Sequence, residues 1–462
     1  MAAITSFLGL GSGLDLSSLL KELDSAERLK LEPLTERKKA NETKISAFGT
    51  LQGNLSALQT ASDKLNDIQT FQGQKSATSG TGITVAASSE AVAGSYQVKV
   101  TQLARAQSLA TSGVADVDSE LGSGVLSISA GSVALDDITV DSSNNTLLGI
   151  RDAINAQGKG VMATIINDGD ATAPYRLVIS SRATGEASPV NVSFTGTGDA
   201  VNLLGYDSAD PAAAGNVMTE TVPAANAKLT VNGLNIVSQS NTVEEAIQGV
   251  TITATSVSDE QTVTISRDTA AIRKAVTDFV GAYNTLITTT TELTSYNADT
   301  KVAGALLGDS SLRNIQAQIR TALGTPVEGG AYSVLSDLGV SLQVDGKLKI
   351  DDSQLDAVLN DDINELSKVL AGSNNITKSD GIAGGLSSRL ATILSSDGIV
   401  NRAIGGLKSA NSALDEDYKR LEASIVSTVD RYRTQFAQLD ALVADMNSTA
   451  SYLTQQFNAL TA

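Results

Sequence analysis

The sequence predicts an α+β multidomain protein whose N- and C-terminal helices pair as a coiled-coil or helical-bundle stalk, with β-rich domains inserted between them. Three observations carry this prediction. From Ile425 onward, apolar residues recur at alternating spacings of four and three, as in a coiled-coil seam. A helical period also occupies residues 16–70. Residues 78–267 are rich in Gly, Ser, Thr and Val and contain segments that alternate with the period of strands.

The C-terminal seam is the most regular pattern in the chain. No Pro or Gly interrupts it, and no charged side chain follows Asp445. The surface helix of a monomer normally carries a charged face opposite its apolar stripe, so we expect this helix to be surrounded by other helices. A terminal helix that needs partners indicates an assembly protein. The seam comprises Ile425, Val429, Tyr432, Phe436, Leu439, Val443, Met446, Ala450, Leu453, Phe457 and Leu460.

Composition excludes several classes of function. Lys and Arg number 33 against 51 Asp and Glu, and the net charge of −18 argues against nucleic acid or an anionic membrane as partner. Without Cys or His there are no ordinary zinc ligands, no Ser-His-Asp triad and no thiol nucleophile. We therefore expect no enzyme, catalytic residue, metal or cofactor. The N-terminus lacks a basic, apolar signal-peptide pattern, and no apolar run is long enough to span a membrane.

The N-terminal stripe begins at Leu16, Leu20 and Leu23. Pro33 should kink this helix, or end it and start another. A second run from Ile45 to Ile68 continues the helical period, and its natural partner is the C-terminal helix.

The β-rich region reads as two related modules, one inserted into a loop of the other. Each contains strands and a short helix, which we expect around Leu147–Ile154 and Val243–Ile247. The stretch 107–227 holds 14 acidic and 4 basic residues, a net charge of −10. This charge favours solubility of an outward-facing domain, and the alternative is repulsion from an acidic surface or recruitment of a basic ligand. The expected strands are Tyr96–Val100, Val125–Ser129, Val161–Ile166, Tyr175–Ser180, Lys228–Val231, Val250–Ser256 and Thr262–Ser266.

Helical periodicity returns after residue 268. It is interrupted at 338–350 by a predicted hairpin with Asp345-Gly346 as a type I′ turn. The expected domains are residues 1–42 with 424–462 as a terminal coiled-coil leg, 43–77 with 268–423 as a mainly helical domain, 78–106 with 227–267 as a β-rich domain, and 107–226 as an outer β-rich insertion. An axial coil that carries outward β domains is typical of a filament or tube component.

Paired acidic residues are the other candidate sites, as acid/base pairs or calcium ligands. Each pair adjoins a turn or a helix start, where Asp is favoured for capping, so we interpret them as structural. The basic residues between Lys21 and Lys39 alternate with Glu, which predicts a salt-bridged helix face. The acidic pairs are Asp136-Asp137, Asp168/Asp170, Asp351-Asp352 and Asp361-Asp362.

Motifs at both ends resemble the flagellar hook-associated protein 2 family, the flagellar filament cap proteins. The N-terminal motif is GLGSGLDLSSLLKEL. The C-terminal motifs are LSDLGVSLQVDGKLKIDDSQLDAVL, GIAGGLSSRLATIL and RYRTQFAQLDALVADMNSTASYLTQQF. Residues 122–165 are similar to a short module shared among flagellin and hook-associated proteins.

The resemblance implies a protein exported through the flagellar type III channel without a cleaved signal peptide. It implies an extracellular homo-oligomeric ring, commonly pentameric, at the filament tip, where arriving flagellin is held until it folds. The coil would contact flagellin and the hook–filament junction proteins through Leu16, Leu20, Leu23, Tyr432, Phe436, Leu439, Val443, Met446, Leu453, Phe457 and Leu460. An export chaperone is expected at the C-terminal region, and some members adhere to host mucus or surface glycans. A surface adhesin on a coiled-coil stalk, or a flagellin-like filament or junction subunit, remains the alternative.

Overall fold

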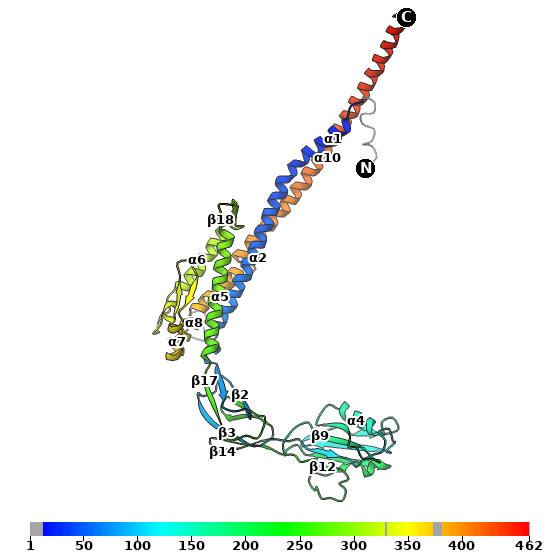
Figure 1. Ribbon diagram of the computed structural model, residues 1–462, viewed down its shortest axis with the longest axis vertical. Coiled ribbons are helices and arrows are strands. Elements are labelled where there is room, and N and C mark those ends of the chain that lie inside the picture. Colours follow the sequence, from blue (N-terminus) through cyan, green and yellow to red (C-terminus); the bar gives the residue numbers. More distant parts are fainter. Residues whose placement is uncertain (1–12, 329, 373–380, 462) are drawn as a thin grey trace. The chain divides into compact units, whose positions relative to one another are not determined.

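The computed structural model describes residues 13–328, 330–372 and 381–461, except for the side chains of residues 460 and 461. The chain divides into two compact units. Residues 1–71 with 269–462 form one, here called the helical unit, and residues 72–268 form the β unit. Long helices at both ends of the sequence and a β-rich stretch between them confirm the predicted fold class (Figure 1). In the described part of the chain, no helix is long and apolar enough to cross a membrane.

The helical unit is built mainly from α2, α5, α9 and the very long α10. Its N-terminal elements are α1 (Leu16–Arg28), the 3-10 turn η2 (Leu29–Leu31), α2 (Glu32–Asn66) and α3 (Gln69–Gln72), which ends at the unit boundary. Next come α5 (Thr269–Thr294), β18 (Tyr296–Asn297), β19 (Val302–Ala303), α6 (Ser310–Gly324) and η4 (Leu335–Leu338). The last are β20 (Val340–Leu342), β21 (Leu348–Ile350), α7 (Asp352–Asp361), α8 (Ile363–Ala371), α9 (Ile382–Leu394) and α10 (Ile399–Thr461).

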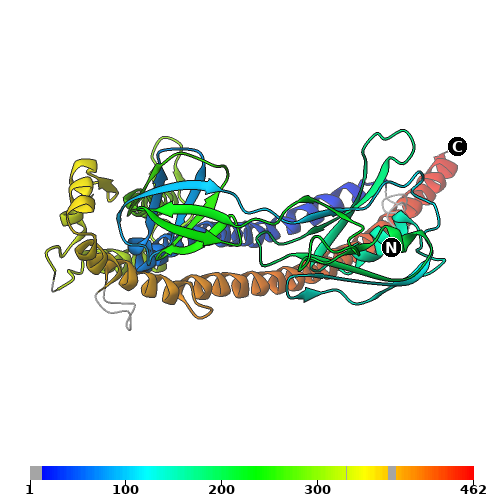
Figure 2. The ribbon, with the colours of Figure 1, turned by 90° about the horizontal axis from the view of Figure 1, so that it is seen from below.

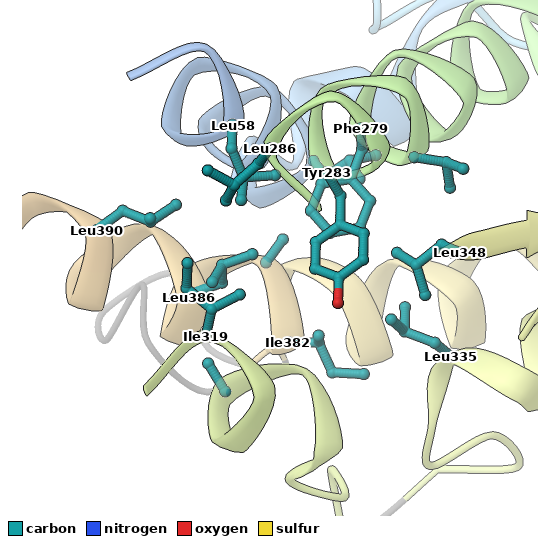
Figure 3. Packing of buried hydrophobic residues seen from close by; sticks show 14 of the residues in the cluster. Leu58, Phe279, Tyr283, Leu286, Ile319, Leu335, Leu348, Ile382, Leu386 and Leu390 are labelled. Carbon is teal, nitrogen blue, oxygen red and sulfur yellow. The ribbon is translucent and has the colours of Figure 1, made fainter. Parts of the chain in front are cut away.

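The core of the helical unit lies where α2, α5 and α9 meet. Leu51, Leu55 and Leu58 of α2 are completely buried. Tyr283 and Phe279 of α5 are the large side chains beside them, and Figure 3 shows them among leucines and isoleucines from α2, α6, α9 and the 3-10 turn η4. Burial raises the pKa of the Tyr283 hydroxyl. This cluster fixes the helices that support the terminal coil.

Aspartates begin several of these helices, as predicted. The Asp351 carboxylate accepts hydrogen bonds from the backbone N–H groups of Ser353 and Gln354 at the start of α7, each 3.1 Å long. The Asp362 carboxylate caps α8 in the same way. These contacts satisfy N–H groups that have no partner inside the helix. One member of each of these two acidic pairs is therefore a capping residue, while Asp352 pairs with Arg273 and Asp361 accepts a hydrogen bond from the Tyr332 hydroxyl.

The predicted hairpin exists as β20 and β21, but its turn differs from the prediction. The strands end at Leu342 and Leu348, which leaves a five-residue loop. Only Gly346 has a positive φ, whereas a type I′ turn needs it at both central residues. The Gly346 N–H donates to the Gln343 carbonyl (3.0 Å), and the Gln343 N–H donates to the Lys347 carbonyl (2.8 Å). By contrast, Asn232 and Gly233 both have positive φ and join β13 to β14 by a two-residue turn.

The inner module of the β unit, residues 74–102 and 227–267, consists of two antiparallel sheets around one core. The larger sheet has the order β1 (Gln74–Thr78), β17 (Gln261–Arg267), β3 (Gly94–Gln102), β13 (Ala227–Val231) and β14 (Leu234–Ser238). The smaller sheet has the order β15 (Thr242–Ile247), β16 (Val250–Ala254) and β2 (Ile83–Ala87).

The expected helix around Val243–Ile247 is wrong, because this segment is strand β15. β15 pairs with β16 at Val243↔Ile252 and Ile247↔Val250, and the register is irregular between these two pairs. Glu245 has a φ of 60° in the irregular stretch. The bulge shifts the alternation of side chains, which imitates a helical spacing in the sequence.

The outer module, residues 108–222, has its own core and two further antiparallel sheets. One has the order β11 (Gly205–Tyr206), β10 (Val190–Thr197), β5 (Ser123–Ala130) and β6 (Val133–Ala134), and β7 (Ile138–Val140) also pairs with β5. The other has the order β12 (Thr219–Val222), β4 (Ser108–Ala110), β9 (Tyr175–Ser181) and β8 (Val161–Asn167). Helix α4 (Leu147–Ala156) lies against β8, and η3 (Asp199–Asn202) against β10.

Strand β8 is the edge of its sheet, and a side chain from α4 occupies that edge. The Asn155 carboxamide accepts a hydrogen bond from the Ala163 N–H (2.9 Å) and donates one to the Ala163 carbonyl (2.7 Å). It thereby makes the two bonds that a neighbouring strand would make at this residue.

Candidate assembly surface

The terminal coil pairs α1 and the start of α2 with the middle of α10 (Figure 2). Leu20, Leu31, Ile425 and Val429 form its buried cluster. Tyr418, Leu421, Tyr432 and Phe436 pack against this cluster and are half-buried. Leu16 is buried and Leu23 is half-buried. Five of the predicted contact residues therefore lie where α1 and α10 of the same chain pack together. They are Leu16, Leu20, Leu23, Tyr432 and Phe436.

Polar contacts fix the direction and register of the coil. The Lys38 ammonium lies 2.6 Å from the Asp415 carboxylate, and the Asn41 amide donates to the Asn411 side-chain oxygen at 2.9 Å. Residue numbers rise along α2 while they fall along α10, so the two helices are antiparallel. The hydrogen bond to Asp415 raises the pKa of Lys38. In the segment predicted to carry a salt-bridged face, Arg28 pairs with Asp24 at 3.0 Å and Lys30 pairs with Glu27 at 2.5 Å.

A shallow groove of about 590 Å³ follows the contact between α1 and α10. Leu20, Val426 and Val429 supply its apolar surface. Arg433 also lines it and pairs with Asp430, while the buried Nε atom of Arg433 has no hydrogen-bond partner in the described part of the chain. Lys21, Asp24, Arg28, Asp430 and Arg433 add charged groups to its lining, so the groove is only partly apolar.

The rest of the predicted seam lies beyond this coil. Leu439, Met446, Leu453 and Phe457 are exposed, with 40%, 62%, 49% and 66% of their surface accessible. Val443 is half-buried, and the side chain of Leu460 lies outside the described residues. Figure 1 shows α10 continuing past α1 to its C-terminal end. The structure therefore does not bring these residues together with Leu16, Leu20 and Leu23.

Two exposed apolar side chains in this stretch are missing from the predicted seam. Leu442 and Tyr452 are 59% and 60% accessible and each stands one position before a seam residue. Apolar residues that flank a regular stripe widen it into a broad apolar face. The positions of Leu442 and Tyr452 beside the stripe are therefore the sequence signal that could have identified them. The distal stretch of α10, residues 439–459, thus offers a wide apolar surface without charged groups beyond Asp445.

The remaining acidic pairs have structural partners. Asp168 pairs with Arg176, and Asp136 lies 3.2 Å from the Lys159 ammonium. Backbone N–H groups of Thr172 and Ala173, with the Thr172 hydroxyl, lower the pKa of Asp170 to about 2. Within residues 13–328, 330–372 and 381–461, no group of three or more acidic side chains is arranged to hold a metal ion.

Comparison with known proteins covers both ends of the chain. The model of the flagellar hook-associated protein 2 N-terminus matches residues 12–107, and that of the C-terminus matches residues 224–448. The outer module, residues 108–222, lies outside both matched ranges.

Full-length relatives are similar over nearly the whole chain. "Flagellar hook-associated protein 2" of Escherichia coli strain K12 is 38% identical over 476 residues, which cover 99% of this chain and 98% of the relative. The protein of the same name from Salmonella typhimurium is 36% identical over 100% of this chain and 99% of its own length.

A solved structure shares the fold. The crystal structure of the D1-D2-D3 domains of the flagellar cap protein FliD from Escherichia coli superposes with a TM-score of 0.68 at 36% identity. The match covers 78% of this chain and 99% of that chain.

Proposed function

The chain belongs to the flagellar hook-associated protein 2 family, and on this basis we propose that it caps the distal end of the bacterial flagellar filament. In this role, copies of the chain form a ring outside the cell that retains exported flagellin and promotes its folding and polymerisation at the tip. The role is structural rather than catalytic.

The exposed apolar face of distal α10 is the observation that carries the proposal. Leu439, Met446 and Leu453 lie on a helix that carries no charged side chain after Asp445. Most helix stability in proteins comes from tertiary packing, so such a helix is expected to function when other helices cover it. Flagellin and the hook–filament junction proteins, which are themselves assembly subunits, are the proposed partners. Before export, a cytoplasmic chaperone would cover the same C-terminal region.

We assign a separate role to each of four parts of the chain. Residues 1–42 with 424–462 act as the leg, and residues 43–77 with 268–423 hold the leg in place. Residues 78–106 with 227–267 and residues 107–226 form the plate above the filament. Separate buried clusters in the coil, the helical core and the two β modules support this division.

Substitution of the apolar face by an uncharged helix former tests the proposal. Gln has a high helix propensity, so Met446→Gln with Leu453→Gln should keep α10 helical and the protein folded. We expect cells with this variant to lose motility and release unpolymerised flagellin into the medium. The matched control is Ser448→Gln with Ser451→Gln, which changes exposed residues of the same helix and should leave swimming unchanged.

The alternative role gives a different result. If the Met446/Leu453 variant is exported and its cells swim normally, the capping proposal is wrong. Normal swimming with lost attachment to mucus-coated surfaces would instead favour an adhesin on a stalk.

A further inference from the structure

The tip of the β20–β21 hairpin, residues 342–346, exposes two large apolar side chains. Val344 is fully exposed, and Leu342 is 59% accessible. Two lysines, Lys347 and Lys349, follow on the same hairpin, and neither forms an ion pair with a residue that the structure describes. The tip also carries the exposed Asp345, so the segment from Leu342 to Lys349 holds two lysines against one carboxylate in a chain with a net charge of −18.

The hairpin is firmly attached to the helical unit. The Asn284 side chain donates to the Leu348 carbonyl (2.8 Å) and accepts from the Leu348 N–H (2.7 Å). Val340 and Leu348 are buried in the helical core. A rigid projection loses little conformational entropy when it docks, which is a property of contact sites.

The outer module contains a matching hollow, here called the outer trough. Its volume is about 800 Å³, and strands β5 and β10 and the loop after β11 line it. Phe194, Val201 and Val217 provide apolar surface in the trough, and Val201 is 43% accessible. Asp137 and Asp207 provide carboxylates, and both are exposed. Neither is ion-paired to a cation within the described residues.

We propose that the hairpin tip of one copy docks into the outer trough of a second copy. Val344 and Leu342 would cover the apolar surface, and Lys347 and Lys349 would face Asp137 and Asp207. The two lysines are opposite in charge to the two trough carboxylates, and complementary charges select the partner and fix its register.

A contact between two different surfaces of identical chains is heterologous, and such contacts close into rings when the rotation between copies allows it. The inference therefore rests on the proposed ring and names one of its contacts. A hairpin tip buries little area, so a single contact should be weak and gain strength from closure of the ring.

Cysteine cross-linking tests the contact cleanly because the chain contains no Cys. Val344→Cys and Ser193→Cys, the latter in the outer trough, are placed on separately tagged chains, mixed and oxidised. We expect disulfide-linked dimers that carry both tags. Lys347→Glu with Lys349→Glu should abolish the cross-link, and Asp137→Lys with Asp207→Lys on the other chain should restore it.

Two control pairs measure random collision. Val302→Cys replaces Val344→Cys at another exposed strand of the helical unit, and Ser119→Cys replaces Ser193→Cys at an exposed position outside the outer trough. Equal yields from the control pairs overturn the proposal, as does a yield that charge reversal leaves unchanged.

Failure of this contact is distinguishable from failure of the proposed function. Rings seen end-on by electron microscopy without the specific cross-link would show that copies assemble through other surfaces. Absence of both rings and filament capping would overturn the proposed function itself.

Discussion

The helical unit contains two apolar stripes with similar residue spacing, one on α2 and one on distal α10. The first is buried and the second is exposed to solvent. On α2, Leu51, Leu55 and Leu58 are completely buried between α5 and α9. On distal α10, Leu439, Met446 and Leu453 follow the same kind of repeat and are 40–62% accessible. The repeat therefore determines which face of a helix is apolar, while the rest of the chain determines whether that face is covered.

The difference has a geometric cause. The α2 stripe lies in the part of the helical unit where α5 and α9 of the same chain pack against it. α10 rises about 1.5 Å per residue and continues for more than twenty residues beyond Phe436, the last residue packed on the coil cluster. The described part of α1 begins at Leu16 and does not cover this extension.

The largest loss of stability is expected from a substitution in the buried α2 stripe. Leu55→Ala should leave a cavity in the helical core and lower the free energy of unfolding by about 2–5 kcal/mol. Denaturant unfolding of the isolated protein measures this change. Wild-type stability in the variant would contradict the contrast between the two stripes.

The terminal coil should show an intermediate effect. Ile425→Ala removes a buried side chain whose burial contributes about 1.5–3 kcal/mol, and the loss should be local to the coil. Hydrogen exchange should accelerate around residues 418–436 while the helical core stays protected. Val426→Ala, an exposed neighbour on the same turn, is the control. If Ile425→Ala lowers core protection equally, the coil and core unfold as one unit.

A smaller effect is expected at the ion pair between α2 and α10. The hydrogen bond to Asp415 raises the folded-state pKa of Lys38 above its ordinary value of 10.5. The stabilisation by this pair is therefore complete below pH 10.5 and disappears as the pH rises through the raised pKa. Lys38→Met should weaken the coil slightly below pH 10.5 and not well above it, as measured by thermal melting. A deficit that persists at high pH would indicate lost packing instead.

No effect on stability is expected at the exposed stripe. Leu453→Ala makes the same chemical change as Leu55→Ala, but it removes a side chain that is 49% accessible and leaves no cavity in the free protein. Its melting temperature should match that of the wild type in calorimetry. Early melting would show that distal α10 belongs to an intramolecular core and would remove the basis for docking there.

Much of the fold was predictable because local patterns decide it. Each of the seven strands expected in the β-rich region overlaps an observed strand, and the helix expected at Leu147–Ile154 is α4. Strand β10 was missed because its apolar alternation is short and ends in Thr195, Gly196 and Thr197. Its position is determined by pairing with β5 along eight residues, a long-range contact that a single segment does not encode.

The candidate site was only partly predictable. Periodicity identified Leu20, Ile425 and Val429 as apolar seam residues, and the structure buries them together. The same periodicity included Leu439 and Met446, which the chain leaves exposed. The turn at Asp345-Gly346 shows a similar limit, since the dipeptide permits several turns and the loop length selects among them.

The hydrogen bonds between Asn155 and Ala163 affect the tendency of the chain to aggregate through the edge strand β8. Strand β8 reads VMATIIN, seven uncharged residues without proline at the edge of a sheet, a sequence of the kind that recruits further strands into aggregates. Because the amide of Asn155 already occupies the N–H and carbonyl of Ala163, a strand from a neighbouring chain cannot pair continuously along β8. The Asn155 side chain thereby protects this edge from continuous pairing with another chain into an amyloid-like sheet.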